Sequence, residues 1–143
     1  MDSFTKASRS LTIIGTAALL WNMIGDASFI GQYVMDRPDL AQTDPDSAHL
    51  FAQTPGWVWA IFALSVSTAT AGSVLLLLRR AAAAPLYHLS TSLTLILFGH
   101  SFLATDMLAL KGWGSIALPA LILTLGVAQL LYARAMRAKG VLR

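Results

Sequence analysis

The sequence predicts an all-α fold: an integral membrane bundle of four transmembrane helices with cytoplasmic N- and C-termini. Of the 143 residues, 56% are hydrophobic and only 12% are charged, which is about half the charged fraction of a typical soluble domain. Four stretches approach the roughly 20 apolar residues that a transmembrane helix needs. Basic residues gather at one set of their ends, a pattern typical of the cytoplasmic side of a membrane protein.

The four predicted spans form a single domain, residues 1–143. They cover about residues 11–34, 57–78, 85–103 and 115–132. An outer loop, residues 35–56, carries four Asp residues and three Pro residues, so we expect it to be solvated and interrupted. Residues 79–84 form a short basic turn, and residues 105–114 form a second short link. Short links make sequential helices antiparallel neighbours.

The distribution of Lys and Arg sets the expected orientation. Only Arg37 and Lys111 lie at the predicted outer ends of the spans. The other basic residues lie at the opposite ends of the spans, which are therefore predicted to be cytoplasmic. They are Lys6, Arg9, Arg79, Arg80, Arg134, Arg137, Lys139 and Arg143. Aromatic residues are enriched at both membrane boundaries, and they mark both here. The residues at these boundaries are Trp57, Trp59 and Trp113 outside, and Tyr132 inside.

A signal peptide is an alternative interpretation of the first span. Lys6 and Arg9 precede the apolar residues 11–20, as in a signal peptide. The cleavage site would lie at residues 25–27, where Asp26 replaces the small residue that cleavage favours. Cleavage would leave three spans, and the intact mass of the purified protein distinguishes the two cases.

One face of the first span is small and polar. At 100° per residue it collects Gly15, Ala18, Asn22, Gly25, Asp26, Phe29, Gln32 and Tyr33. An Asp at the centre of a span costs roughly 2.5–3.5 kcal/mol on insertion scales. Polar side chains in a membrane generally face the bundle interior, so we expect this face to point inward.

An intramembrane polar site is the main candidate functional site. Asp26 lies 15 residues after Leu11, and His100 lies 15 residues after Pro85, which places both about 22 Å from the inner boundary. We therefore predict a contact between Asp26 and His100. The predicted site comprises Asn22, Asp26, Gln32, Tyr33 and His100. Two interpretations stay open: a structural hydrogen bond between helices, or a site for a proton or a solute.

Small residues predict where the helices pack closely. The predicted packing residues are Gly15, Ala18 and Gly25 in the first span and Ser65, Ala69, Gly72 and Ser73 in the second. Pro119 lies near the start of the fourth span, where a missing backbone donor has the least effect. Gln129, near the inner end of that span, is expected to reach the lipid headgroups.

Motifs for catalysis, cofactors and metals are absent from the sequence. It has no Cys and lacks a Gly-rich phosphate loop, an HExxH motif and a nucleophile elbow. Its three His residues are predicted at three depths, so we expect no metal site, no cofactor and no catalytic residue. The net charge of +3 is explained by anionic lipid headgroups, and no nucleic acid partner is expected.

Several motifs together resemble a group of small four-span bacterial inner-membrane proteins that are sometimes labelled sugar transporters. The motifs are Trp21-Asn22-x-x-Gly25, Gln32, Pro55-x-Trp57-Val58, Gly72-Ser73 running into Arg79-Arg80, and Tyr132-Ala133-Arg134. The resemblance covers most of the chain and implies a multi-pass inner-membrane location. The Pro-Gln signature of small sugar-transporting bundles is missing. The chain is also similar in size to small multidrug exporters, but its outer loop is longer than theirs.

Two classes of function follow from these observations. The first is a non-enzymatic accessory or assembly subunit that acts through helix contacts with other membrane proteins or with itself; it rests on the small-residue stripes and the absence of reaction motifs. The second is an oligomeric small-solute or proton-coupled transporter that uses a membrane-embedded Asp and His. An integral-membrane enzyme is the third possibility, and it would need a catalytic group that the sequence does not display.

Overall fold

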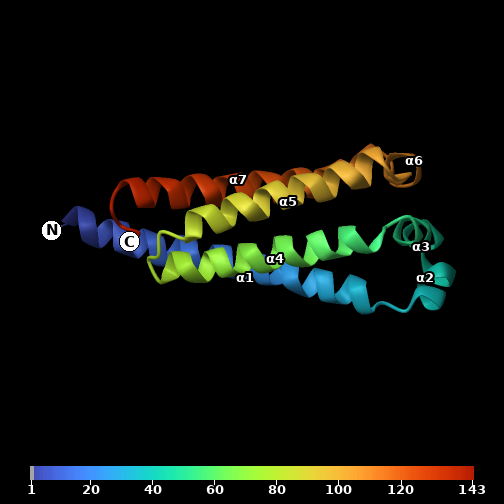
Figure 1. The fold of residues 1–143 in the computed structure, drawn as a ribbon, viewed down its shortest axis with the longest axis horizontal. Helices are drawn as coiled ribbons and strands as arrows, with labels where there is room; N and C mark the ends of the chain where they lie inside the picture. Colours follow the sequence, from blue (N-terminus) through green and yellow to red (C-terminus); the bar gives the residue numbers. More distant parts are fainter. Residues whose placement is uncertain (1) are drawn as a thin grey trace.

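The computed structural model describes residues 2–143, with side chains described for residue 6 and for residues 8–143. Within that range every regular element is a helix. Four long helices run side by side (Figure 1). They are α1 (Asp2–Val34), α4 (Gly56–Leu77), α5 (Ala83–Leu103) and α7 (Ala117–Ala138).

Three segments of the described chain are long and apolar enough to cross a membrane. They are Ser8–Val34, Gly56–Leu77 and Trp113–Ala138. Helix α5 has 21 residues, or about 31 Å at 1.5 Å per residue, so it is about as long as α4 and α7, which have 22 residues each. It differs in composition, because hydroxyl residues and two His residues interrupt its apolar sequence. Three of the four predicted spans are therefore confirmed as helices that are long and apolar enough to cross a membrane.

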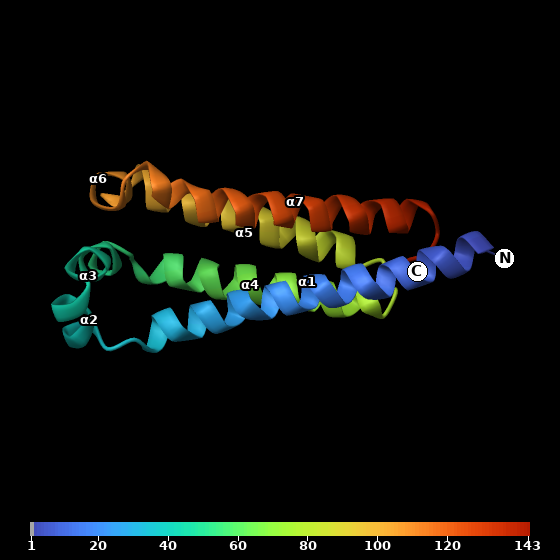
Figure 2. The ribbon, with the colours of Figure 1, turned by 180° about the vertical axis from the view of Figure 1, so that it is seen from behind.

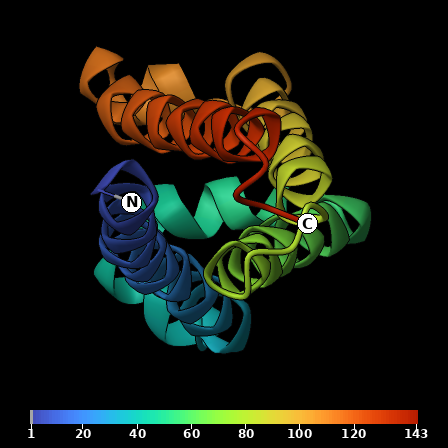
Figure 3. The same ribbon diagram turned by 90° about the vertical axis from the view of Figure 1, so that its left-hand side faces the viewer.

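The four long helices pack in the order α1, α4, α5, α7, each against the next. Figure 3 looks along the helices and shows them around a common centre, and Figure 2 shows α1 lying along α4. The first described residues and the C-terminus lie at one end of the bundle, which we call the terminal end; α2, α3 and α6 lie at the other, the loop end. Sequential long helices are thus antiparallel, as predicted.

At the terminal end, helices α1 and α7 both extend beyond the apolar segments predicted from the sequence. Helix α1 begins at Asp2 and α7 ends at Ala138, whereas the predicted spans run from residue 11 and to residue 132. Hydropathy detects only the part that matches a hydrocarbon core of about 30 Å. Backbone hydrogen bonds continue beyond it, so the added turns carry the basic residues Arg9, Arg134 and Arg137 away from the core.

The loop end is more helical than the expected solvated loop. It contains α2 (Arg37–Thr43), α3 (Pro45–Ala52), α6 (Met107–Lys111) and a 3₁₀ turn, η1 (Trp113–Ile116). Pro38 and Pro45 stand in the first turns of α2 and α3, where the missing N–H has no intrahelical partner to lose. Pro119 lies in the first turn of α7 for the same reason.

Polar contacts join the two halves of the loop end. Asp106 accepts a hydrogen bond from Gln53 at 2.7 Å and lies 3.1 Å from His49 Nε2. Lys111 donates to Asp44 at 3.0 Å. These contacts join the segment between α5 and α7 to α3. The pair of helices α1 and α4 is therefore connected to the pair α5 and α7 at the loop end.

The apolar core lies toward the terminal end. Its buried residues come from all four long helices and from the C-terminal segment; they are Leu11, Leu76, Ala83, Ala84, Tyr87, Ala133, Met136 and Leu142. Toward the loop end the contacts become aromatic and polar.

Candidate functional site

A network of polar side chains connects all four long helices in the interior of the bundle. The Asn22 side-chain amide on α1 donates to Ser73 Oγ on α4 and to Gln129 Oε1 on α7, each at 2.8 Å. Ser73 Oγ lies 2.8 Å from the Tyr87 hydroxyl on α5. Ser73 is fully buried and Asn22 is 8% exposed. Each helix therefore contributes one member, which we call the central network.

The hydrogen-bonding capacity of Ser73 is full. Its hydroxyl donates to Ala69 O at 3.1 Å and accepts from Asn22. A hydroxyl has one proton and two acceptor sites, so Tyr87 must be the donor in the Ser73–Tyr87 bond. Asn22 Nδ2 also lies 3.2 Å from the Ala69 carbonyl, which only accepts and so fixes which way the amide faces.

A second polar contact lies between α4 and α5. Ser65 Oγ is 2.6 Å from Thr94 Oγ1, and Ser90 Oγ donates to the Ser65 carbonyl at 2.8 Å. All three residues are buried. They bond to each other and to their own helices, so this contact holds two helices together without leaving a polar group for a ligand.

The predicted packing residues lie where helices meet. A Cβ on Gly15 would stand 2.7 Å from Leu77 Cδ2, one on Gly25 would stand 3.5 Å from Val66, and one on Gly72 would stand 3.2 Å from the Tyr87 ring. Close approach explains Gly15 and Gly72, whereas the distance at Gly25 is an ordinary van der Waals contact that would also admit alanine. The others are Ala18, Ser65 and Ser73, which are buried, and Ala69, whose carbonyl binds Asn22 and Ser73.

Asp26 occupies a different environment from Asn22. Its Oδ2 accepts a hydrogen bond from Thr70 at 2.5 Å. Both residues line an open groove of about 520 Å³ between α1 and α4. Ser67 is the other polar residue lining it, and Phe29, Ile30, Val66, Ala71 and Val74 complete it. Ser67, Ala71 and Val74 are exposed, so this Asp26 groove opens on the outside of the bundle.

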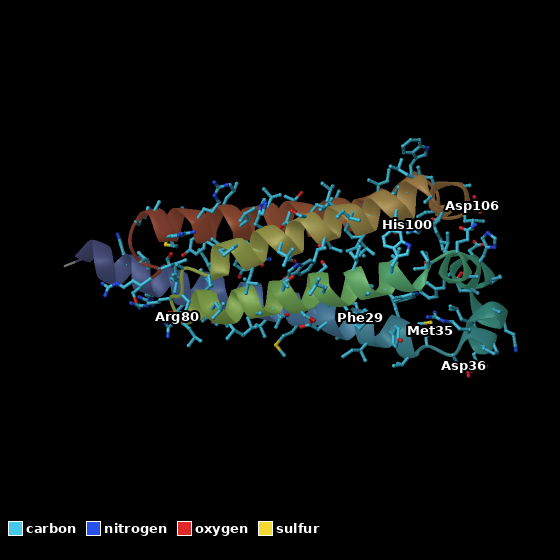
Figure 4. All side chains as sticks on the ribbon, viewed as in Figure 1. Phe29, Met35, Asp36, Arg80, His100 and Asp106 are labelled. Carbon is cyan, nitrogen blue, oxygen red and sulfur yellow. The ribbon has the colours of Figure 1, made fainter. Side chains whose placement is uncertain are left out.

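The predicted contact between Asp26 and His100 is not formed. Asp26 bonds to Thr70, whereas the His100 ring packs edge-on against Trp57, with 5.2 Å between ring centres. Figure 4 shows His100 near the loop end of the bundle. The predicted equal depth is wrong: Asp26 contacts α4 at Thr70 and His100 contacts it at Trp57, which are about 20 Å apart along that helix. Helix α4 also lies between α1 and α5.

Gln32 and Tyr33 lie beyond the central network, toward the loop end of α1. Gln32 is half-buried. Tyr33 is 59% exposed and stacks on Phe29 at 5.5 Å between ring centres. Both rings belong to an aromatic cluster formed by Phe29, Tyr33, Phe51, Trp59 and Phe62. Tyr33 therefore contributes to aromatic packing and not to the central network.

The aromatic cluster holds Arg37. The guanidinium carbon lies 4.5 Å from the centre of the Phe51 ring and 5.3 Å from that of Trp59. The buried Nη1 of Arg37 has no hydrogen-bond partner among the described residues. Attraction to the electron-rich ring faces offsets part of that loss, so one of the two basic residues at the loop end is held against its helices.

Three residues of these sites were not predicted from the sequence: Gln129, Tyr87 and Thr70. Gln129 was expected to reach the headgroups, but α7 continues nine residues further, to Ala138, which places Gln129 about 14 Å from the end of the helix. Tyr87 could have been identified as a candidate, because the hydroxyl of a buried Tyr normally has a hydrogen-bond partner. Thr70 gave none, since Thr commonly bonds to its own helix.

The central network can fix the positions of the four long helices relative to one another. In the Asp26 groove, the Asp26 carboxylate can accept a hydrogen bond from a molecule outside the bundle. A carboxylate has about four acceptor sites, and Thr70 takes one. Within the described residues no group of His, Asp or Glu side chains has the geometry of a metal site. No protein-family model, curated protein or solved structure matches the chain. The function is therefore argued from these residues alone.

Proposed function

We propose that this chain is a non-enzymatic accessory or assembly subunit of a bacterial inner membrane, which binds a helix of another membrane protein in the Asp26 groove. Four spanning helices and cytoplasmic termini complete the proposal, with α5 as the fourth span. The Asp26 groove carries it: a carboxylate lies on the outer side of α1 and α4, away from the central network.

The energetics of the groove favour a partner over lipid. A carboxylate within a span is costly, and intramembrane ionisable residues usually pair. Thr70 supplies one hydrogen bond, and acceptor sites remain. A partner helix with a Lys, Arg, Asn or Gln side chain facing Asp26 would supply the missing donors. The exposed small residues Ser67 and Ala71 would let its backbone approach closely.

The oligomeric transporter is the rival proposal. The Asp26–His100 pair that motivated it is not formed, so it now rests on Asp26 alone. A second copy docked on the groove would enclose the carboxylate between two bundles, where it would be available to a proton. The bundle interior gives this proposal no support, because the central network bonds its members to one another.

Site-specific photo-crosslinking in the native membrane tests both proposals. A photoreactive residue at Ala71, inside the groove, should crosslink the chain to a different membrane protein. The mass of the adduct should exceed that of the chain by the mass of that protein. The same residue at Leu95, an exposed position on α5, should react with lipid. An Ala71 adduct with a second copy would instead support the transporter, and lipid adducts at both positions would contradict both proposals.

A matched pair of variants assigns the contact to the carboxylate. Asp26→Asn should reduce the Ala71 adduct about tenfold, as expected for the loss of a charge-assisted hydrogen bond. Asp36→Asn makes the same chemical change outside the groove and should leave the adduct unchanged. If Asp26→Asn gives the wild-type yield, the partner does not bind through this carboxylate.

A further inference from the structure

A pocket lined by three arginines lies at the terminal end of the bundle. Its volume is about 400 Å³, and Arg79, Arg80 and Arg143 line it together with Ser8. Leu78 and Val141 provide apolar parts of its wall, and Figure 4 marks Arg80 at this end. We call it the arginine pocket. It is separate from the Asp26 groove and shares no residue with it.

Backbone hydrogen bonds hold the three arginines together. The chain leaving α7 turns back under the bundle, where Leu142 is buried in the core. Arg143 N donates to Arg79 O at 2.8 Å, and Ala81 N donates to Arg143 O at 2.9 Å. The pocket is thus built by pairing two segments far apart in sequence. The backbone pairing places three exposed arginines around one space.

The backbone at Arg79 adds a second observation. Helices α4 and α7 end in the same turn, in which two amides bond back to the last carbonyls: Arg79 N and Arg80 N in α4, and Gly140 N and Val141 N in α7. The turn needs a positive φ, which is 69° at Gly140 and 57° at Arg79. Glycine adopts this conformation freely, whereas other residues are strained by roughly 1–2 kcal/mol.

The Arg79 side chain accounts for an arginine at a position that favours glycine. Its guanidinium hydrogen-bonds to Ser8 Oγ on α1 and lines the pocket. Strain of this kind is retained where the residue has a role. Both salt bridges between described side chains lie at the loop end, at His49–Asp106 and Lys111–Asp44. No side-chain carboxylate of the described residues forms a salt bridge with the three guanidiniums, so an external anion could supply counter-charge there.

The shape and place of the pocket point to the chemistry of that anion. Guanidinium groups bind phosphate oxygens in a bidentate way, and basic pockets between membrane helices bind phospholipid headgroups. The pocket lies at the ends of α1 and α4, two helices that are apolar enough to span a membrane. Leu78, which is 63% exposed, offers apolar surface beside the charges. We propose that the arginine pocket binds the phosphate of an anionic phospholipid headgroup.

The test is lipid binding to the purified full-length chain, followed by native mass spectrometry at about 0.5 M salt, where surface charges are largely screened. Phosphatidylglycerol should bind in preference to zwitterionic phosphatidylcholine. The variant Arg80→Gln/Arg143→Gln should weaken phosphatidylglycerol binding about tenfold, the usual effect of losing charge-assisted hydrogen bonds. Arg134→Gln/Arg137→Gln removes the same charge outside the pocket and should change binding less than about twofold.

Two outcomes would overturn the proposal. Equal losses in both double variants would mean that binding follows net charge and not the pocket. Binding of inorganic phosphate that displaces phosphatidylglycerol at equal concentration would mean that the ligand is a soluble phosphate. If lipid binding survives a large excess of inorganic phosphate, the headgroup is the ligand.

Arg79→Gly keeps the test valid if the double variant does not fold. Glycine suits the positive φ of 57° at this position, so the variant should melt at or above the wild-type temperature. It loses the guanidinium, so phosphatidylglycerol binding should still fall several-fold. A variant that is more stable yet binds lipid as well as the wild type would contradict the role of Arg79.

Discussion

Asn22 and Asp26 lie one helical turn apart on α1, yet their surroundings are opposite. Asn22 is buried, and its amide donates to α4 and α7. Asp26 faces an open groove and has one hydrogen bond, from Thr70. A shared helical face therefore does not mean a shared role. Polar groups inside the bundle hold its helices together, whereas the carboxylate of Asp26 lines an open groove.

The largest expected effect on stability comes from substituting Asn22, the buried residue of this pair. Asn22→Leu removes both donors and leaves Ser73 and Gln129 each short of one partner. Hydrogen bonds between membrane helices are worth about 0.6 kcal/mol on average and up to about 1.7, and an unpaired buried group adds to the loss. We expect the free energy of unfolding to fall by about 2 kcal/mol, measured by denaturation in mixed detergent micelles.

A double-mutant cycle shows whether the loss belongs to the network. Gln129→Leu alone should also destabilise the bundle, and combining it with Asn22→Leu should cost less than the sum of the two, because the pair is then replaced by apolar groups. Strict additivity would mean that Asn22 and Gln129 do not interact in the membrane.

The second prediction compares a glycine at a helix contact with one facing open space. Gly72→Ala places a methyl group 3.2 Å from the Tyr87 ring, which is itself buried and bonded to Ser73. Overpacking costs about 1–3 kcal/mol, against a gain of about 1 from replacing glycine in a helix. We expect a net loss of about 1 kcal/mol by the same unfolding assay.

Gly99→Ala is the matched control for this substitution. A Cβ there would have nothing within 4 Å, so the helix gain should appear without a steric term, and stability should rise by up to about 1 kcal/mol. If both variants shift stability in the same direction, the close contact between α4 and α5 is not limiting.

The four long helices could be predicted from the sequence because hydropathy depends on residues that are neighbours in the chain. Apolar length predicted the long helices, and the small residues of α1 and α4 indicated their contacts. Depth was predicted from the ends of the apolar stretches, and these ends do not lie level with one another in the bundle. Asp26 contacts Thr70 and His100 contacts Trp57, about 20 Å apart along α4, so the predicted pairing of Asp26 with His100 failed.

The sites depended on information that a single sequence does not carry. Gln129 contacts Asn22 across 107 positions, and only the rotation of α7 about its own axis decides that contact. The same holds for the arginine pocket, which exists because Arg143 pairs with Arg79. Proline gave a misleading signal in the outer loop, where it begins α2 and α3 instead of breaking the chain.

The third prediction concerns Asp26, the residue of the pair that lines the open groove. Asp26→Leu removes a carboxylate from a groove lined mainly by apolar side chains and breaks one hydrogen bond. The desolvation that is relieved and the bond that is lost are of similar size. We expect the free energy of unfolding to change by less than about 0.5 kcal/mol. A loss as large as that of Asn22→Leu would place Asp26 among the residues that hold the bundle together.

The smallest effect is expected at the loop end, where polar contacts are exposed. Hydrogen bonds from the Ser47 side chain and backbone, and then from Lys111, lower the pKa of Asp44 from its ordinary 3.8 to about 2. A lowered pKa means that these contacts stabilise the fold above pH 3.8 and are lost as the pH falls through about 2. A carboxyl-carbon NMR titration of Asp44 measures this midpoint directly. Ser47→Ala should raise it more than Lys111→Gln, because the Ser47 side chain contributes the largest part of the shift. The reverse order would mean that the salt bridge, and not the start of α3, holds Asp44 ionised.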